Sequence, residues 1–440
     1  MFVPQPTFAR HLDAVNAPSL VRTYGRVKKV VGLVVESTGP TCRVGDLVAI
    51  SHGDERQEIT AEVVGFRDNT VLIMPFGETN GVRVGAMVRN LGSDHTVPFG
   101  SAVLGRVLDG LGRPIDGMPL PDNLHRRAAF NVPPNPLRRQ MIHRSLSLGV
   151  RAIDALATMG VGQRVGVFAG SGVGKSTLLG MVARNTSADV NVIALVGERG
   201  REVREFIEHD LGPEGLERSV VIVATSEQPA LVRVKAAFTA TAIAEGFRDE
   251  GRDVLLMMDS VTRFAMAQRE IGLAIGEPPS SKGYTPSVFA LLPRLMERAG
   301  NAERGSISAI YTILVEGDDT TEPIADTVRA ILDGHIVLSR KLANAGHFPA
   351  VDVLSSLSRV MPLVTSEQEL AASNRLRELI AAYGDVEDLV SIGAYQKGSR
   401  PDADEAIEKW EVIRGFLRQG RSDCTALADS VGRLREIVDA

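Results

Sequence analysis

Residues 164–182 read RVGVFAGSGVGKSTLLGMV, and no other part of the chain constrains its architecture as strongly. The first six residues are mostly apolar and predict a buried strand, whereas Leu178, Met181 and Val182 recur at helical spacing. Between strand and helix, residues 170–177 (GSGVGKST) have the glycine-rich form of a P-loop. The sequence therefore predicts a phosphate-binding loop at the start of a helix.

Each residue type in this loop fits the binding of ATP with Mg²⁺. Glycines let backbone N–H groups turn inward around phosphate oxygens, and the helix N-terminus adds a favourable dipole. Lys175 can reach the β- and γ-phosphates, and the Ser176 hydroxyl can ligate magnesium. The consensus has glycine where this chain has Ala169, a change that we treat as tolerated. The predicted nucleotide-binding residues are Gly170, Ser171, Gly172, Val173, Gly174, Lys175, Ser176 and Thr177.

Further short apolar runs follow at intervals, and helical stretches separate most of them. They lie at residues 192–196, 220–224, 254–258, 307–315 and 335–338. Strands that are apolar on both faces and alternate with helices predict a parallel sheet covered on both sides. The predicted fold class is therefore α/β, with a RecA-like P-loop NTPase core that hydrolyses ATP.

Two acidic residues follow strands of this predicted sheet. Asp259 ends the apolar run 254–258, where a carboxylate beside a P-loop can hold the magnesium shell. Glu198 follows the strand at 192–196 within GERGRE, residues 197–202, and is placed to polarise an attacking water. The residues alone leave open that GERGRE is only a solvent-exposed charge cluster.

Composition changes along the chain predict four segments. Residues 1–22 form a proline-containing tail for partner docking, and the alternative is a disordered tail. Residues 23–92 carry short β-rich runs with frequent turns and predict a β-barrel. Residues 93–365 form the ATPase domain, including a proline-rich connector to about residue 140, and residues 366–440 read as a helical domain.

Bulk properties argue against several classes of protein. The formal net charge is −5, and no long Lys/Arg stripe is visible, which counts against nucleic acid as the main partner. The two cysteines are far apart, so a disulfide framework or zinc site is not expected. No apolar run is long enough for a membrane span, and no secretory signal is apparent.

From about residue 25 to 400, the chain resembles the catalytic chains of the F/V-type rotary ATPase superfamily. It resembles more closely the type III protein-export ATPases of flagella and injectisomes. The most specific stretches are 168–177, 197–202, 259–270, 271–300 and 346–359. The run 271–300 is particular to the export branch, and KGYTP at 282–286 looks flagellar.

The resemblance implies further site residues. Glu198 matches the catalytic carboxylate, with Arg199 and Arg263 near the phosphates and Glu202 behind them. Phe348 stands where the family places an aromatic ring against adenine; a core ring is the alternative. Arg359 matches an arginine finger that acts on a neighbouring subunit. The stretch 271–284 would line the pore of a ring; an ordinary mobile surface loop is the alternative.

The same resemblance implies a homo-hexamer that energises flagellar export at the inner membrane from the cytoplasm. The implied partners are a stator-like regulator at the N-terminus, a coiled-coil stalk in the pore, export-gate membrane proteins and chaperone–substrate complexes. Four alternatives remain: an injectisome ATPase, a rotary ATP synthase catalytic subunit, a Rho-like RNA translocase, and a non-catalytic nucleotide-binding subunit. Lys175 and Glu198 are both present, which disfavours the last of these.

Overall fold

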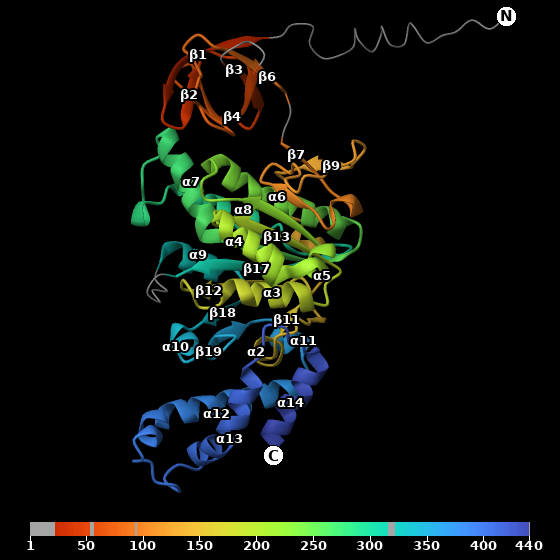
Figure 1. Ribbon diagram of the computed structural model, residues 1–440, viewed down its shortest axis with the longest axis vertical. Coiled ribbons are helices and arrows are strands. Elements are labelled where there is room, and N and C mark those ends of the chain that lie inside the picture. The colour runs from red at the N-terminus through yellow and green to blue at the C-terminus, as the bar shows by residue number, and fades with distance from the viewer. Residues whose placement is uncertain (1–22, 53–56, 93–94, 316–321, 440) are drawn as a thin grey trace, which may run out of the picture. The chain divides into compact units, whose positions relative to one another are not determined.

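The computed structural model describes residues 23–52, 57–92, 95–315 and 322–439, and Figure 1 shows their ribbon. They divide into two compact units, one built on the residues before Thr96 and the other on most of the residues after it. The predicted docking tail, residues 1–22, lies outside the described residues. Among the helices that are described, none combines the length and apolarity that crossing a bilayer requires.

The first unit is a closed β-barrel with the strand order β1-β2-β5-β4-β3-β6. Residues 26–35, one of the β-rich runs of this segment, are divided between two strands, because Gly32 at φ 56° turns the chain into a hairpin. Val35, Ile50 and Ile73 are fully buried inside the barrel. The strands are β1 Tyr24–Val31, β2 Val34–Ser37, β3 Leu47–His52, β4 Gln57–Arg67, β5 Thr70–Pro75 and β6 Met87–Asn90.

A nine-stranded sheet, counted over the described residues, forms the centre of the second unit, with the order β19-β18-β12-β17-β15-β13-β14-β8 and β16 beside β17. The P-loop strand β12 lies between β18 and β17, and both pair with it in parallel. The predicted fold class is confirmed. The strands are β8 Val107–Asp109, β12 Arg164–Ala169, β13 Val190–Val196, β14 Ser219–Ala224, β15 Asp253–Asp259, β16 Gly300–Asn301, β17 Ser306–Leu314, β18 Gly334–Leu338 and β19 Val351–Ser358.

Helices cover both faces of this sheet. The chain crosses from β12 to β13 through α3 in one direction along the sheet and from β14 to β15 through α6 in the other. Right-handed crossovers in opposite directions place their helices on opposite faces, as Figure 1 shows for α3 and α6. The helices of this region are α2 Arg151–Leu156, α3 Lys175–Asn185, α4 Gly200–Glu205, α5 Gly212–Glu217, α6 Ala230–Asp249, α7 Val261–Ile275, α8 Pro286–Met296, α9 Pro323–Ile331, α10 Arg340–Asn344 and α11 Met361–Val364.

The chain ends in three helices, α12 Glu367–Ser391, α13 Pro401–Leu417 and α14 Leu427–Asp439. Ser366 and Glu369 form a capping box that satisfies backbone donors where α12 begins. Leu376, Ile413 and Leu434, one from each helix, are fully buried and join the same core as the sheet residues around β12. The helical segment is therefore packed onto the ATPase core.

Three features differ from the sequence expectations. The proline-rich connector is more than a linker, since its residues 107–109 form the sheet strand β8 and pair in parallel with β14. The sheet is not purely parallel, since β19 runs antiparallel to β18. The stretch 271–284 is not one loop, because α7 continues to Ile275 and Tyr284 is only 5% exposed.

Candidate functional site

The P-loop adopts the conformation that its glycines permit. Gly172 and Gly174 have φ values of 77° and 89°, a region that favours glycine. Val173 between them is buried and fixes the loop to the core, whereas Ser171 and Ser176 are exposed. Lys175 is the first residue of α3, so the loop ends at the N-terminus of a helix of 11 residues. This arrangement presents unpaired backbone N–H groups to an anion.

Two carboxylates converge on Lys175 from neighbouring strands. Asp259 ends β15 and pairs with the Lys175 ammonium through Oδ1. Glu198 follows β13, and its Oε1 lies 3.5 Å from Lys175 Nζ. In the sheet order β12-β17-β15-β13, Asp259 is the last residue of β15, and Lys175 and Glu198 follow the carboxyl ends of the parallel strands β12 and β13. The structure therefore brings together the three residues that the sequence separates by up to 84 positions.

A fourth residue of this cluster was not predicted. Thr312 lies on β17, and its hydroxyl donates to Asp259 Oδ1 at 2.7 Å and thereby orients that carboxylate. Thr312 is fully buried in a strand, SISAIYTIL, that also carries the hydroxyl groups of Ser306, Ser308 and Tyr311. Because the strand has four hydroxyl-bearing residues, no local sequence pattern distinguishes Thr312 from the others.

Burial controls the charge states of this cluster. The Glu198 side chain is only 15% exposed, and burial followed by the nearby Asp259 charge raises the pKa of Glu198 to about 7. For Lys175, burial lowers the pKa, but the charges of Asp259 and Glu198 outweigh it and hold the pKa above its ordinary value. A carboxyl group whose pKa is near neutrality is suited to accept a proton from water.

This pKa leads to a prediction about pH dependence. If Glu198 accepts the proton, kcat/KM for ATP should fall by about tenfold per pH unit below about pH 7, because the protonated carboxyl cannot act as a base. Above about pH 8, kcat/KM should be flat. The measurement is kcat/KM from pH 5.5 to 8.5. A Glu198→Gln variant that kept the same acid limb would contradict the assignment.

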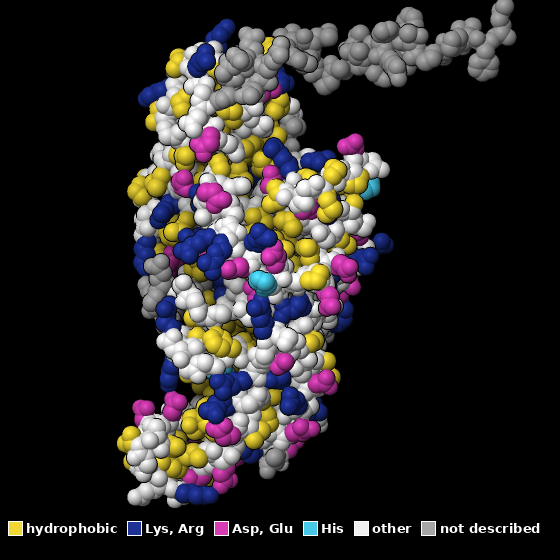
Figure 2. All heavy atoms as spheres, viewed as in Figure 1, with side chains coloured by type: hydrophobic (Ala, Val, Ile, Leu, Met, Phe, Trp, Pro, Cys, Tyr) yellow, Lys and Arg dark blue, Asp and Glu magenta, His cyan; other side chains and the backbone are white. Residues whose placement is uncertain are grey.

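The remaining predicted residues occupy different surroundings. Arg199 has a 78% exposed side chain and pairs with Glu202 at 3.4 Å, so it does not reach the Lys175 cluster. Figure 2 shows basic side chains gathered near α4, where Arg201 and Arg204 also form exposed pairs with glutamates. The GERGRE run is therefore divided: Glu198 turns inward, and the arginines that follow it face solvent.

Arg263 lies directly behind the loop that carries Glu198. A Cβ added to Gly197 would lie 2.7 Å from Arg263 Cβ, so only glycine allows this approach. Arg263 Nε is buried, and no residue in the described part of the chain accepts a hydrogen bond from it. A buried guanidinium donor without an acceptor is consistent with the predicted contact to phosphate.

Phe348 lies beside the P-loop of its own chain, whereas Arg359 lies far from it. The Phe348 ring is 45% exposed, and a Cβ on Gly174 would be 3.4 Å from two of its atoms, so the ring lies against the P-loop. It is not a core ring. Arg359 instead follows the last residue of β19, Ser358, which pairs with Gly334 at the start of β18. Arg359 is exposed at the end of the sheet remote from the P-loop.

The site fits both groups that the P-loop implies. A phosphate chain fits the turn at Gly172 and Gly174, where no side chain intrudes except the Phe348 ring. Ser176 and Asp259 offer hard oxygen ligands, which suit Mg²⁺ held by few protein groups together with phosphate. Bound there, Mg²⁺ would supply charge neutralisation of the phosphate oxygens.

Three family models match the chain in succession. The ATP synthase alpha/beta family, beta-barrel domain, matches residues 27–92, and the nucleotide-binding domain of the same family matches residues 149–358. The T3SS EscN ATPase C-terminal domain matches residues 365–436.

Similar proteins come from both flagellar and secretion systems. A flagellum-specific ATP synthase of Bacillus subtilis is 56% identical over 97% of this chain and 98% of its own. A type 3 secretion system ATPase of Xanthomonas euvesicatoria is 51% identical over 95% of both chains. The assembled ATPase EscN of enteropathogenic E. coli superimposes with a TM-score of 0.89 at 47% identity, over 94% of this chain and all of EscN, and a further structure holds EscN with its central stalk EscO.

Proposed function

The chain belongs to the type III export ATPases of the ATP synthase alpha/beta family, and from this premise we propose that its nucleotide site powers the export of flagellar proteins. The protein is an ATPase. The observation that carries the proposal is the convergence of Lys175, Glu198 and Asp259 beside the P-loop. A non-catalytic nucleotide-binding subunit would not need a buried carboxylate with a pKa near 7 at this place.

In the proposed reaction, each residue acts on a separate part of the substrate. The Lys175 ammonium and the backbone N–H groups at the start of α3 bind the phosphates. Glu198 orients the attacking water and accepts its proton, and Arg263 donates to a phosphate oxygen. Ser176 and Asp259 would hold Mg²⁺, and Phe348 would pack against the base. Arg199 is exposed and can reach phosphate only if α4 moves or a neighbouring subunit covers it.

Assembly into a ring would add the positive charge of a neighbouring subunit's arginine to each nucleotide site. Arg359 lies at the opposite end of the sheet from its own P-loop, so we propose that it reaches the site of a neighbouring copy in a ring of six. The proposal is supported by the existence of assembled EscN and of EscN with a stalk. The other proposed partners are a regulator at residues 1–22, the export gate and chaperone–substrate complexes, with the ring attached peripherally to the inner membrane.

The test compares two phenotypes and one enzymatic property. Deletion of the gene should abolish motility, and complementation with the Lys175→Ala chain should fail to restore it. Specific ATPase activity should rise cooperatively with protein concentration as the ring assembles. A deletion strain that swims normally but fails to secrete effector proteins would instead support the injectisome function, which the similarity to secretion ATPases keeps as the second candidate.

A further inference from the structure

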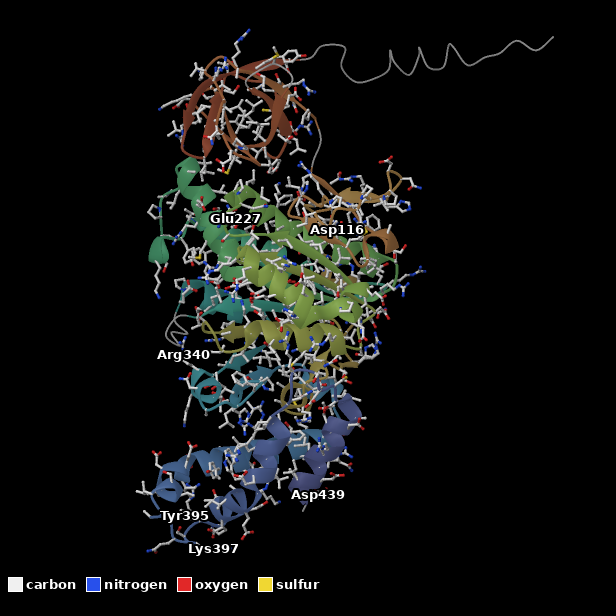
Figure 3. The ribbon with its side chains drawn as sticks, in the orientation of Figure 1. Asp116, Glu227, Arg340, Tyr395, Lys397 and Asp439 are labelled. Atoms are coloured by element: carbon white, nitrogen blue, oxygen red, sulfur yellow. The ribbon has the colours of Figure 1, made fainter. Side chains whose placement is uncertain are left out.

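The segment between α13 and α14 reaches from the helical domain to the nucleotide site. We propose that residues 418–423 are a positioning element for Phe348, so that the helical domain sets the affinity of the site for the base of the nucleotide. This inference rests on the proposed role of Phe348. Tyr395 and Lys397 mark the outer end of the helical domain in Figure 3, and α13 leads from there towards the core.

Gln419 holds this segment in place through a buried network. Its side chain is 5% exposed, accepts from Arg151 N at 2.9 Å and donates to Gly149 O at 2.7 Å. The Arg151 guanidinium donates three hydrogen bonds, to Phe416 O, Arg418 O and the Thr425 hydroxyl. Since buried polar groups that are fully paired define a single geometry, the backbone at residue 419 is fixed relative to α2.

Two bonds then connect the fixed segment to the loop that carries the ring. The backbone N–H of Gln419 donates to Phe348 O at 2.9 Å. The exposed Arg418 side chain donates to Gly346 O at 2.6 Å. Both carbonyls belong to the short loop between α10 and β19, and the Phe348 ring at its end lies against Gly174 of the P-loop.

The same segment also contacts the far end of the P-loop helix. Arg184 donates to Arg421 O at 2.6 Å, and Asn185 donates to Asp423 O at 3.3 Å. Arg421 in turn pairs with Asp210 at 3.2 Å, beside α3. The segment therefore spans the adenine side of the site and the C-terminal end of α3, and it keeps the two in register.

The expected consequence is a change in affinity without a change in the chemical step. A ring that is already in place when the base arrives needs no ordering on binding. The base lies remote from the transferred phosphoryl group, so the ring should bind substrate and transition state alike. Loss of such uniform binding raises KM and leaves kcat unchanged.

The main test uses Arg418→Ala, since this side chain is exposed and its backbone carbonyl keeps the bond from Arg151. KM for ATP and the inhibition constant for ADP should rise roughly two- to tenfold, the effect of one hydrogen bond, with kcat unchanged. Inhibition by inorganic tripolyphosphate, which lacks a base, should not change. Gln419→Ala should have a larger effect of the same kind. Arg414→Ala, an exposed arginine one turn earlier in the chain, is the matched control.

A double-mutant cycle tests whether Arg418 acts on nucleotide binding through the Phe348 ring. If residue 418 acts through the ring, Arg418→Ala should add nothing to KM in a Phe348→Ala background. The emission of Trp410, the sole tryptophan, which stacks on Tyr383 at 3.7 Å, should be unchanged if the helical domain stays folded. The inference would be overturned if Arg418→Ala weakened the binding of ATP and of tripolyphosphate equally, or if the effects of Arg418→Ala and Phe348→Ala on KM were additive. If Arg418→Ala left KM unchanged while Phe348→Ala weakened ATP binding, only this inference would be overturned. If Phe348→Ala left the affinity for ATP unchanged, the proposed base site itself would be removed.

Discussion

Replacing Arg359 with alanine is expected to lower kcat on the order of 10³–10⁵-fold, about 4–7 kcal/mol, while the chain stays folded. The reason is geometric. Ser358 pairs with Gly334, which lies level with Val165 in β12, four residues before the last residue of that strand. At about 3.3 Å per residue, Arg359 is displaced by about 13 Å along the strands from the start of its own P-loop. We therefore expect its charge to act on another subunit.

Mixing two inactive variants tests this sharing directly. Arg359→Ala keeps Glu198, and Glu198→Gln keeps Arg359, so a mixed ring contains some interfaces with both residues. At equal amounts, roughly a quarter of the head-to-tail interfaces should be intact and active. Arg201→Ala, another exposed arginine, serves as the control. Wild-type activity in Arg359→Ala, or no recovery in the mixture, would refute the trans assignment.

The second large effect is expected at Glu198. Glu198→Gln should lower kcat on the order of 10²–10⁴-fold, because the amide cannot accept the proton of the attacking water. ATP binding should persist, since Lys175 and the start of α3 are intact. Turnover and equilibrium binding of ATP are the two measurements, with Glu208→Gln, an exposed glutamate, as the matched control.

Lys175→Ala separates binding from chemistry. This change removes the ammonium that pairs with both carboxylates, so binding and turnover should be lost together. If Glu198→Gln behaved in the same way as Lys175→Ala, Glu198 would be needed for binding rather than for the chemical step. A Glu198→Gln variant with near wild-type kcat would exclude it as the base.

The sequence predicted the strands that are buried on both faces more successfully than the edges of the sheet. β12 and β15 are apolar over most of their length, so their composition alone identifies them. β8 has only three residues, and β19 is interrupted by exposed residues. Only strands that are buried on both faces need a continuous apolar run, and β19 at the edge of the sheet has exposed residues.

The site was predictable where chemistry follows directly from the end of a strand. Lys175, Asp259 and Glu198 were placed together because parallel strands bring their carboxyl ends to one edge. Arg199 was expected near the phosphates from the family resemblance, yet its side chain is exposed to solvent and pairs with Glu202. Thr312 and Gln419 act through partners 53 and more than 200 positions away, and no local pattern reveals such pairs.

The ion pairs of Lys175 have a consequence for substrate binding. The Lys175 ammonium is already matched by the carboxylates of Asp259 and Glu198. Phosphate must therefore compete with the protein's own anions for that cation, and a weakly charged solute cannot do so. Each occupancy by substrate would detach Glu198 from its counter-ion and release it for chemistry. Substrate binding at Lys175 is thus an exchange of one ion pair for another.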